Sequence, residues 1–218
     1  MKKLTLLLFI PFSFTNIRAQ ANVKDSLKLL LQNAKQDAAR VLLLADLGFE
    51  YVQSKPDTVM LLAVEGLELS RKINFEKGEA MSLNRIGNAF SDLGNYPKAM
   101  EAYLQALKIN EKINNLDEKQ KNLNNIGGIY SSLSDYRQAL DYFFKAKAIA
   151  GKINNKKSLS IYLANIGNQY YNLEIFDSAM LYIQQAYNIG LQINYSKIIG
   201  NALLLMGNIH RKTEQTTL

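Results

Sequence analysis

Very few side chains in this sequence have the chemistry that catalysis or metal binding commonly requires. The 218 residues contain a single histidine, His210, and no cysteine. A disulfide framework and a thiolate metal site are therefore excluded. One imidazole also removes most Ser-His-Asp triads and most zinc sites. The composition accordingly predicts no metal and no cofactor.

The remaining candidates for chemistry each have a simpler structural explanation. Gly127 and Gly128 lie inside a helical pattern and not after a strand, so they do not form a phosphate loop. Asp46 and Glu50 are four residues apart, which is typical of the solvated face of a helix. His210 takes the position of a packed aromatic residue, and we expect it in the core. No catalytic residue is predicted, and an enzyme of unrecognised type remains the alternative.

Asparagine is the polar residue whose spacing is most regular. Its side chain carries an acceptor and two donors, so it can bind both the C=O and the N–H of an extended peptide. The candidate peptide-binding residues are Asn84, Arg85, Asn88, Asn124, Asn125, Asn165, Asn168, Tyr171 and Asn172. The alternative is that the chain is simply rich in Asn, Lys and Ile because of genomic base composition.

These candidates belong to a repeat of 40 residues. Glycines recur at 87, 127, 167 and 207, at intervals of 40 (127 − 87, 167 − 127, 207 − 167). Other residues keep the same interval: Phe90, Tyr130, Tyr170 and His210; Ala99, Ala139 and Ala179; Ala106, Ala146 and Ala186. A weaker copy precedes them and holds Leu47, Gly48 and Tyr51, with Val59 and Gly66 at the alanine positions. Fixed self-similarity of this length is typical of solenoids.

Each unit predicts two amphipathic helices, a first helix A and a second helix B. With Leu83 as position 4, positions 4, 7, 8 and 11 form one narrow buried stripe, which includes Gly87. The candidate peptide-binding residues occupy positions 5, 6, 9, 12 and 13, opposite that stripe. Asn95 and Asp135 are placed to cap helix B. The glycine at position 8 and the recurring alanines of helix B allow the two helices to approach closely. The aromatic residue at position 11 fills the space between them.

The pattern resembles the tetratricopeptide repeat family, in its long variety of about 40 residues. HEAT repeats are the alternative, but they lack this Gly–aromatic–Ala–Ala spacing. The resemblance implies an all-α fold: a right-handed α-solenoid of antiparallel helix pairs, the tetratricopeptide superhelix, with the A helices on its concave side. It also implies an asparagine ladder at Asn125 and Asn165, with Arg85 as a less regular member. The implied partner is a protein or an extended peptide.

The N-terminal residues predict export. Lys2 and Lys3 precede an apolar stretch, Leu4 to Phe14, and Ala19 and Ala21 have the spacing of a cleavage site. An uncleaved anchor is the alternative. Removal of residues 1–21 takes away Lys2, Lys3 and Arg18 and lowers the formal charge from +7 to +4 (7 − 3). This modest charge does not predict nucleic-acid binding. We expect a periplasmic or secreted bacterial protein.

The predicted units are a signal peptide (1–21), a capping helix (22–37), repeats at 38–77, 78–117, 118–157 and 158–195, and a helix A alone (196–218). Asp25 or Ser26 is expected to cap the 22–37 helix, with Leu27, Leu30 and Leu31 as its apolar stripe. In the last unit, Leu204 and Leu205 are expected to be exposed and to form an interface, with a homodimer through this helix as one alternative.

Two functions remain open at this point. One is an exported scaffold that binds protein or peptide partners in its concave groove and performs no catalysis. The other is suggested by a resemblance to the periplasmic region of bacterial histidine kinases and helix-turn-helix regulators: the chain would be the sensing fragment of a truncated signalling receptor. A membrane is implied only if the chain is part of such a receptor.

Overall fold

The computed structural model describes residues 12–51 and 55–216, and within this part of the chain it contains ten helices and no strand. Side chains are described from residue 23 to residue 214, apart from 52–54. The helices are α1 (Phe12–Asn33), α2 (Ala38–Tyr51), α3 (Pro56–Lys72), α4 (Glu76–Asp92), α5 (Tyr96–Lys112), α6 (Leu116–Ser132), α7 (Tyr136–Lys152), α8 (Lys156–Asn172), α9 (Phe176–Gln192) and α10 (Ser196–Thr216). The predicted all-α repeat solenoid is confirmed.

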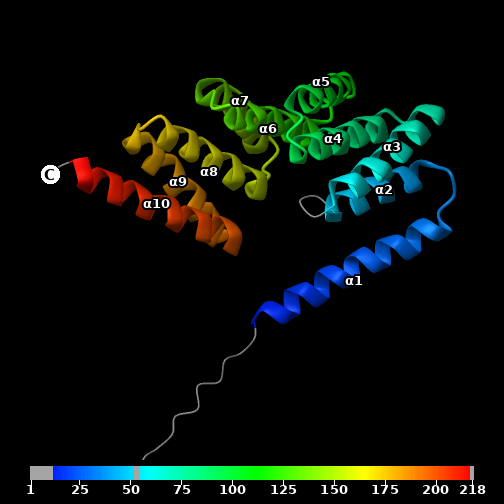
Figure 1. Cartoon of the computed structure of the whole chain (residues 1–218), viewed down its shortest axis with the longest axis horizontal. Coiled ribbons are helices and arrows are strands. Elements are labelled where there is room, and N and C mark those ends of the chain that lie inside the picture. The colour runs from blue at the N-terminus through cyan, green and yellow to red at the C-terminus, as the bar shows by residue number, and fades with distance from the viewer. Residues whose placement is uncertain (1–11, 52–54, 217–218) are drawn as a thin grey trace, which may run out of the picture.

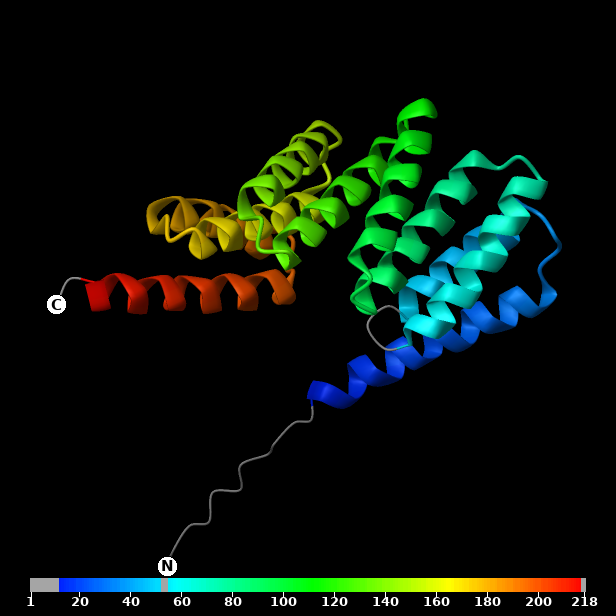
Figure 2. The same cartoon turned by 45° about the horizontal axis from the view of Figure 1, so that its top comes forward.

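The helices alternate between two roles along the solenoid (Figure 1). Helices α2, α4, α6, α8 and α10 are the A helices, and α3, α5, α7 and α9 are the B helices that pack beside them (Figure 2). Helices α4, α6, α8 and α10 begin at residues 76, 116, 156 and 196, so the starts of these helices keep the interval of 40 residues. They begin two residues before the predicted unit boundaries at 78, 118 and 158.

Short polar side chains cap the starts of helices α5, α6, α7 and α8. Asn95 and Asp135 accept hydrogen bonds from the backbone N–H of Lys98 and Gln138, at 3.3 and 3.1 Å, and these predicted caps are confirmed. Asn115 and Asn155 cap the A helices α6 and α8 in the same way. Each cap satisfies an amide of the first turn, which has no partner within the helix.

The recurring Ile-Asn sequence marks the turn from each B helix to the next A helix. The asparagines at 74, 114, 154 and 194 all have φ between 52° and 54°. This left-handed conformation is unfavourable for most side chains, and asparagine is among the residues that tolerate it best. The turn from A to B needs the same conformation, which Gly94 adopts with φ of 73°.

Small residues let the paired helices approach each other. Ala99, Ala139 and Ala179 are fully buried at the start of helices α5, α7 and α9. At Gly167 a side chain would meet helix α9 itself, because a Cβ there would lie 3.3 Å from the backbone O of Ala179 and the backbone N of Ile183. The predicted role of glycine and alanine at the A–B contact is therefore confirmed.

At two other repeats the glycine makes room for an aromatic ring. A Cβ on Gly127 would lie 2.8 Å from the ring of Phe143, which is buried on α7. Tyr103 of α5 covers Gly87 in the same way. In both repeats the ring of helix B crosses the surface of helix A where a side chain would otherwise lie.

Helix α1 differs from the expected capping helix. It begins at Phe12, so Asp25 and Ser26 lie inside it and do not cap it. Leu30 is exposed, while Leu27 and Leu31 are partly buried. Arg40 joins α1 to α2 through a 2.9 Å hydrogen bond from Nη1 to the backbone O of Leu31. The predicted signal peptide falls largely on residues 1–11 and on side chains up to residue 22, which lie outside the described residues.

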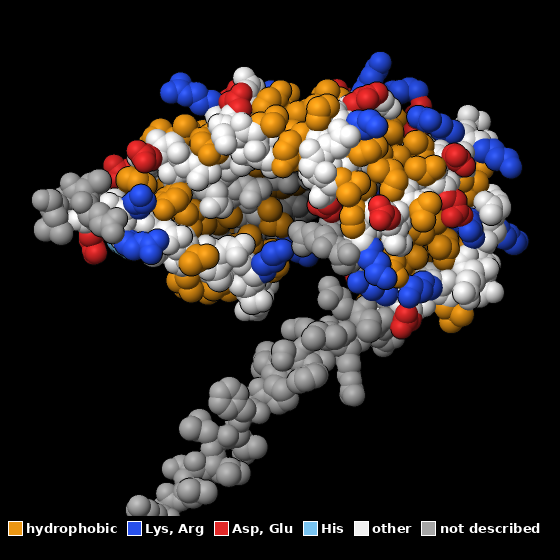
Figure 3. Space-filling view, in the orientation of Figure 1, with side chains coloured by type: hydrophobic (Ala, Val, Ile, Leu, Met, Phe, Trp, Pro, Cys, Tyr) orange, Lys and Arg blue, Asp and Glu red, His pale blue; other side chains and the backbone are white. Residues whose placement is uncertain are grey.

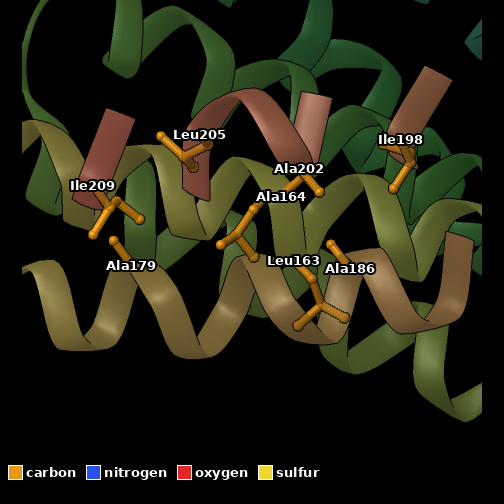
Figure 4. Packing of buried hydrophobic residues seen from close by; sticks show 9 residues of the cluster. Leu163, Ala164, Ala179, Ala186, Ile198, Ala202, Leu205 and Ile209 are labelled. Carbon is orange, nitrogen blue, oxygen red and sulfur yellow. The ribbon is translucent and has the colours of Figure 1, made fainter. Parts of the chain in front are cut away.

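In helix α10 two expectations, for Leu205 and for His210, are wrong. Leu205 is only 6% exposed, whereas Leu204 is 68% exposed as predicted. His210, expected in the core, is exposed. The described part of the chain has no B helix after α10, so the core face of α10 turns to α8 and α9. Ile198, Ala202, Leu205 and Ile209 all point toward those two helices (Figure 4). The exposed leucine pair is Leu203 and Leu204.

The neighbouring glycines of α6 should respond to alanine in opposite directions. Gly127→Ala is expected to lower the free energy of unfolding by about 1–2 kcal/mol, because overpacking against Phe143 exceeds the helix propensity that alanine gains. Gly128→Ala has open space around it and should raise the free energy by about 0.5–1 kcal/mol. Urea unfolding of both variants measures the difference. Equal effects would contradict the described packing.

Alanine substitutions at Leu204 and at Leu205 should also differ in their effect on stability. Leu205→Ala removes a side chain from the α8–α9–α10 core and is expected to cost about 2–5 kcal/mol. Leu204→Ala should change stability by less than about 0.5 kcal/mol, because this side chain lies in solvent. Thermal unfolding followed by circular dichroism checks both values, and a costly Leu204→Ala would show that α10 packs through its other face.

Candidate functional site

The A helices α4, α6 and α8 line a groove. It consists of two adjoining hollows of about 630 and about 440 Å³, which share Asn88, Asn124 and Asn125. In the orientation of Figure 1, the molecular surface is hollowed below α6, between α8 and α2 (Figure 3). The first hollow lies toward the C-terminal ends of the A helices, and the second lies toward their N-terminal ends and reaches Phe49 of α2.

A chain of side-chain hydrogen bonds crosses the groove from repeat to repeat. Asn165 Nδ2 donates to Asn124 Oδ1 at 2.8 Å, and Asn124 Nδ2 donates to Asn125 Oδ1 at 3.4 Å. Asn125 Nδ2 then donates to Asn88 Oδ1 at 3.1 Å. Tyr103 Oη also donates to Asn88 Oδ1, at 2.8 Å. The predicted asparagines of three A helices are therefore connected and oriented by one network.

Most of the predicted residues line the groove. Asn168 and Asn172 lie at its C-terminal end and are exposed to solvent. Asn84 lines the second hollow but is buried, and its Oδ1 accepts a 3.2 Å hydrogen bond from Arg85 Nη1. Tyr171 does not line either hollow, because its ring packs against Phe176 with the centroids 5.9 Å apart.

Aromatic rings of the B helices form part of the groove wall. Tyr103 and Phe143 line the first hollow, which they reach by crossing over the glycines of α4 and α6. Burial raises the pKa of the Tyr103 hydroxyl above its ordinary value, and a negative charge on Asp92 acts in the same direction. This phenol therefore stays protonated and keeps donating to Asn88.

The N-terminal end of the groove carries charged side chains. Arg85, Lys121, Lys157 and Asp117 all line the second hollow. Lys121 forms ion pairs of 2.7 Å with Asp117 and with Glu118. Burial opposes the ionisation of Asp117, but hydrogen bonds from Lys121, Gln120 and Asn155 outweigh it and lower the pKa of this carboxyl.

Several groove residues were not predicted. Ser91, Asp92, Lys121, Ser131 and Ser132 occupy positions 2, 12 and 13 of the repeat, where the same pattern would have found them. Tyr103 and Phe143 could be found only by recognising that the ring of helix B crosses the glycine of helix A. Asn155 and Ser158 lie at the start of α8, where the predicted boundary between residues 157 and 158 assigned them to different units.

The described part of the chain offers neither a metal-binding cluster nor a membrane-spanning helix. Residues 12–51 and 55–216 contain no group of His, Cys, Asp and Glu side chains arranged to hold a metal ion. Over the same residues, no helix has both the length and the apolar character to span a lipid bilayer.

Comparisons with known proteins identify the repeats. Residues 80–113 match one sequence model of the tetratricopeptide repeat, and residues 123–157 match another. A search of curated protein sequences found no match. The chain thus contains tetratricopeptide repeats within an all-α solenoid.

Solved structures share this fold at low sequence identity. Aspartyl phosphate phosphatase F from Bacillus subtilis superposes with a TM-score of 0.76 at 18% identity, over 93% of this chain and 52% of that chain. A Rap protein complexed with competence and sporulation factor gives 0.79 at 16% identity, over 92% and 61%. A signal transduction ATPase with a tetratricopeptide repeat sensor from Pyrococcus horikoshii gives 0.67 at 20%, over 86% and 30%. The chain therefore spans about half of the first of these proteins.

The buried tyrosines of the groove should make stability depend on alkaline pH. Burial raises the pKa of both Tyr103 and Tyr162 above the ordinary value of about 10. Above pH 10 the unfolded chain loses these protons while the folded chain keeps them, so the free energy of unfolding should fall as pH rises. Urea unfolding between pH 8 and 11 measures this slope.

The control for this prediction is the variant Tyr103→Phe with Tyr162→Phe. Its free energy of unfolding should fall less steeply over the same pH range than that of the wild type, because the two buried phenols are gone. Lysine titration contributes equally to both proteins and does not affect the comparison. Identical slopes would mean that these phenols are accessible to water.

Proposed function

We propose that this chain is a non-catalytic scaffold that binds an extended segment of a protein partner along the groove of its A helices. The observation that carries the proposal is the amide network that joins Asn88, Asn124, Asn125 and Asn165 across three repeats. A row of oriented amides on successive repeats can bind the backbone of a peptide irrespective of most of its side chains.

The network leaves hydrogen-bonding capacity for a ligand. An amide nitrogen has two N–H groups, and each Nδ2 in the chain of bonds uses one of them. Among the described residues, no side chain donates a hydrogen bond to Asn165 Oδ1. Asn168 and Asn172 add two exposed amides at the C-terminal end of the groove. Because the network holds the amides in place, binding loses little side-chain entropy.

Export to the periplasm or to the cell exterior is part of the proposal. It is supported by the basic residues Lys2 and Lys3, the apolar stretch that follows, and the Ala19–Ala21 spacing. The absence of cysteine is compatible with an oxidising compartment.

A second candidate function is that of a sensing region within a bacterial signalling receptor. It is favoured by the similar fold of a tetratricopeptide repeat sensor in a signal transduction ATPase, of which this chain covers 30%. A scaffold should copurify with a fixed protein partner. A sensor should change its binding or assembly when a small molecule is present.

The proposal predicts that Asn125→Ala combined with Asn165→Ala weakens peptide binding. Peptides selected from a random 12-residue display library on the purified protein serve as ligands. Their Kd is expected to rise about 5- to 150-fold, because each of the two lost hydrogen bonds contributes about 0.5–1.5 kcal/mol. Both amides are only partly buried, so their removal should lower the melting temperature by only a few degrees.

The matched control is Gln184→Ala with Asn188→Ala, which removes an amide pair from the exposed face of α9 (Nε2 to Oδ1, 3.2 Å). This variant should bind the same peptides with unchanged affinity. If the groove variant also binds them unchanged, the asparagine network serves only to join the repeats and the proposed function is wrong.

A further inference from the structure

The middle A helix of the groove lacks one of the recurring asparagines. Asn88, Asn168 and Asn208 all stand at position 9 of the repeat, whereas α6 has Gly128 there. Gly128 lines the first hollow, and a Cβ placed on it would meet no other atom within 4 Å. The row of amides on the groove surface therefore has a gap in α6, between α4 and α8, where a side chain would otherwise lie.

A glycine at position 9 can be covered by the next A helix, as the first unit shows. Gly48 has the same position in α2, and a Cβ on it would lie 3.9 Å from Cγ and from Cδ of Arg85. The residue that corresponds to Arg85 beside Gly128 is Asn165 (128 − 48, 165 − 85). Asn165 is shorter and donates to Asn124 instead, at 2.8 Å. The gap at Gly128 thus stays open in the described part of the chain.

The aromatic ring beside the gap also differs in this unit. At position 24 the second unit has Tyr103, whose hydroxyl donates to Asn88 Oδ1 at 2.8 Å. The third unit has Phe143 at that position, which lines the same hollow and has no hydroxyl. Both the amide and the phenol that binds it are therefore missing from the third unit. The gap consequently has an apolar side toward Phe143.

The polar groups around the gap are neutral amides. Asn165 Oδ1 accepts no side-chain hydrogen bond within the described residues, so it can accept one from a ligand. Asn125 Nδ2 uses one N–H on Asn88 and has a second to donate. Among the described residues, Asp92 is the only charged side chain that lines this hollow, one turn beyond position 9. The lining therefore matches a neutral group that both donates and accepts, because a charged group would lose its hydration here.

We propose that the gap at Gly128 binds the side-chain amide of a glutamine or asparagine in the peptide ligand. The ligand amide takes the place of the missing position-9 asparagine, with its methylene carbon beside Phe143. Its oxygen accepts from Asn125 Nδ2, and its nitrogen donates to Asn165 Oδ1. This inference rests on the proposed peptide-binding function of the groove and adds the side chain that the groove selects.

The test uses 12-residue peptides selected from a random display library on the wild-type protein. The strongest binder is synthesised in its selected form and with the recurring amide residue exchanged for Met, for Glu or for the other amide residue. Methionine keeps an unbranched side chain without the amide, and glutamate replaces the amide by a charge. Isothermal titration calorimetry gives Kd for each peptide with wild-type protein, with Gly128→Asn and with the control Gly151→Asn. Gly151 is exposed near the end of α7, and a Cβ there also has open space.

Gly128→Asn fills the gap with the residue of the neighbouring units. We expect it to raise Kd for the selected peptide about 5- to 150-fold, the range that two lost hydrogen bonds give. Exchange of the peptide amide for Met or Glu should weaken binding to the wild type by a similar factor. Combining either exchange with Gly128→Asn should add little, since both changes remove the same contact. Gly151→Asn should leave Kd unchanged, and the exchange of the two amide residues shows which length fits.

Three results would overturn the inference. The first is a set of selected peptides without a recurring glutamine or asparagine. The second is a Met or Glu peptide that binds the wild type as tightly as the amide peptide does. The third is a melting temperature of Gly128→Asn clearly below that of the wild type, because the space above Gly128 would then be filled. We expect an equal or higher value, since asparagine has the better helix propensity.

The failure of this inference and that of the proposed function give different results. If Asn125→Ala with Asn165→Ala weakens binding but Gly128→Asn does not, the groove binds peptides and the amide site is wrong. If no peptide is selected at all, both are wrong.

Discussion

The close contact between the two helices of each repeat is the constraint on which the rest of this structure depends. A helix pair of this kind cannot bury its apolar face alone, so each pair depends on its neighbours for a continuous core. At Gly167 the glycine lies against the backbone of α9. At Gly127 the ring of Phe143 from helix B covers the glycine instead. The same rings then form the groove wall, so core packing and groove lining are one feature.

A second contact, between successive A helices, builds the groove. The residues at 85, 125, 165 and 205 each reach back to the preceding A helix. In the middle repeats this contact is made by asparagine, which leaves polar groups on the concave surface. In the last repeat it is made by Leu205, which closes the core. At this one position of the repeat, an asparagine leaves polar groups on the groove surface, whereas a leucine closes the apolar core.

Much of the fold could be predicted because the repeat supplies several independent signals at one interval. Glycine, aromatic residue and two alanines recur together, and the caps at Asn95 and Asp135 follow from short polar side chains before apolar runs. The errors at His210 and Leu205 have different physical causes. The pattern of the inner repeats places a B helix over the position of His210, and α10 has none among the described residues, so this side chain is exposed. Leu205 was expected in solvent, but its position lies toward the preceding A helix, and there it packs in the core between α8, α9 and α10.

The groove was predictable only in part. Repeat positions located the asparagines, but they gave no indication that these side chains bond one another across 37 to 41 residues of sequence. Asn84 shows the limit most clearly, because it sits at a concave position and is nonetheless buried beneath Arg85.

Site-specific photo-crosslinking in the native host tests most directly whether a protein partner binds in the groove. A photoreactive amino acid would replace Asn168, which is exposed in the groove, or Gln185, which is exposed on helix α9 outside it. We expect a discrete crosslinked partner from position 168 and none from position 185. Crosslinking from position 185 alone would contradict it, because the partner would then bind the B helices and leave the concave groove unoccupied.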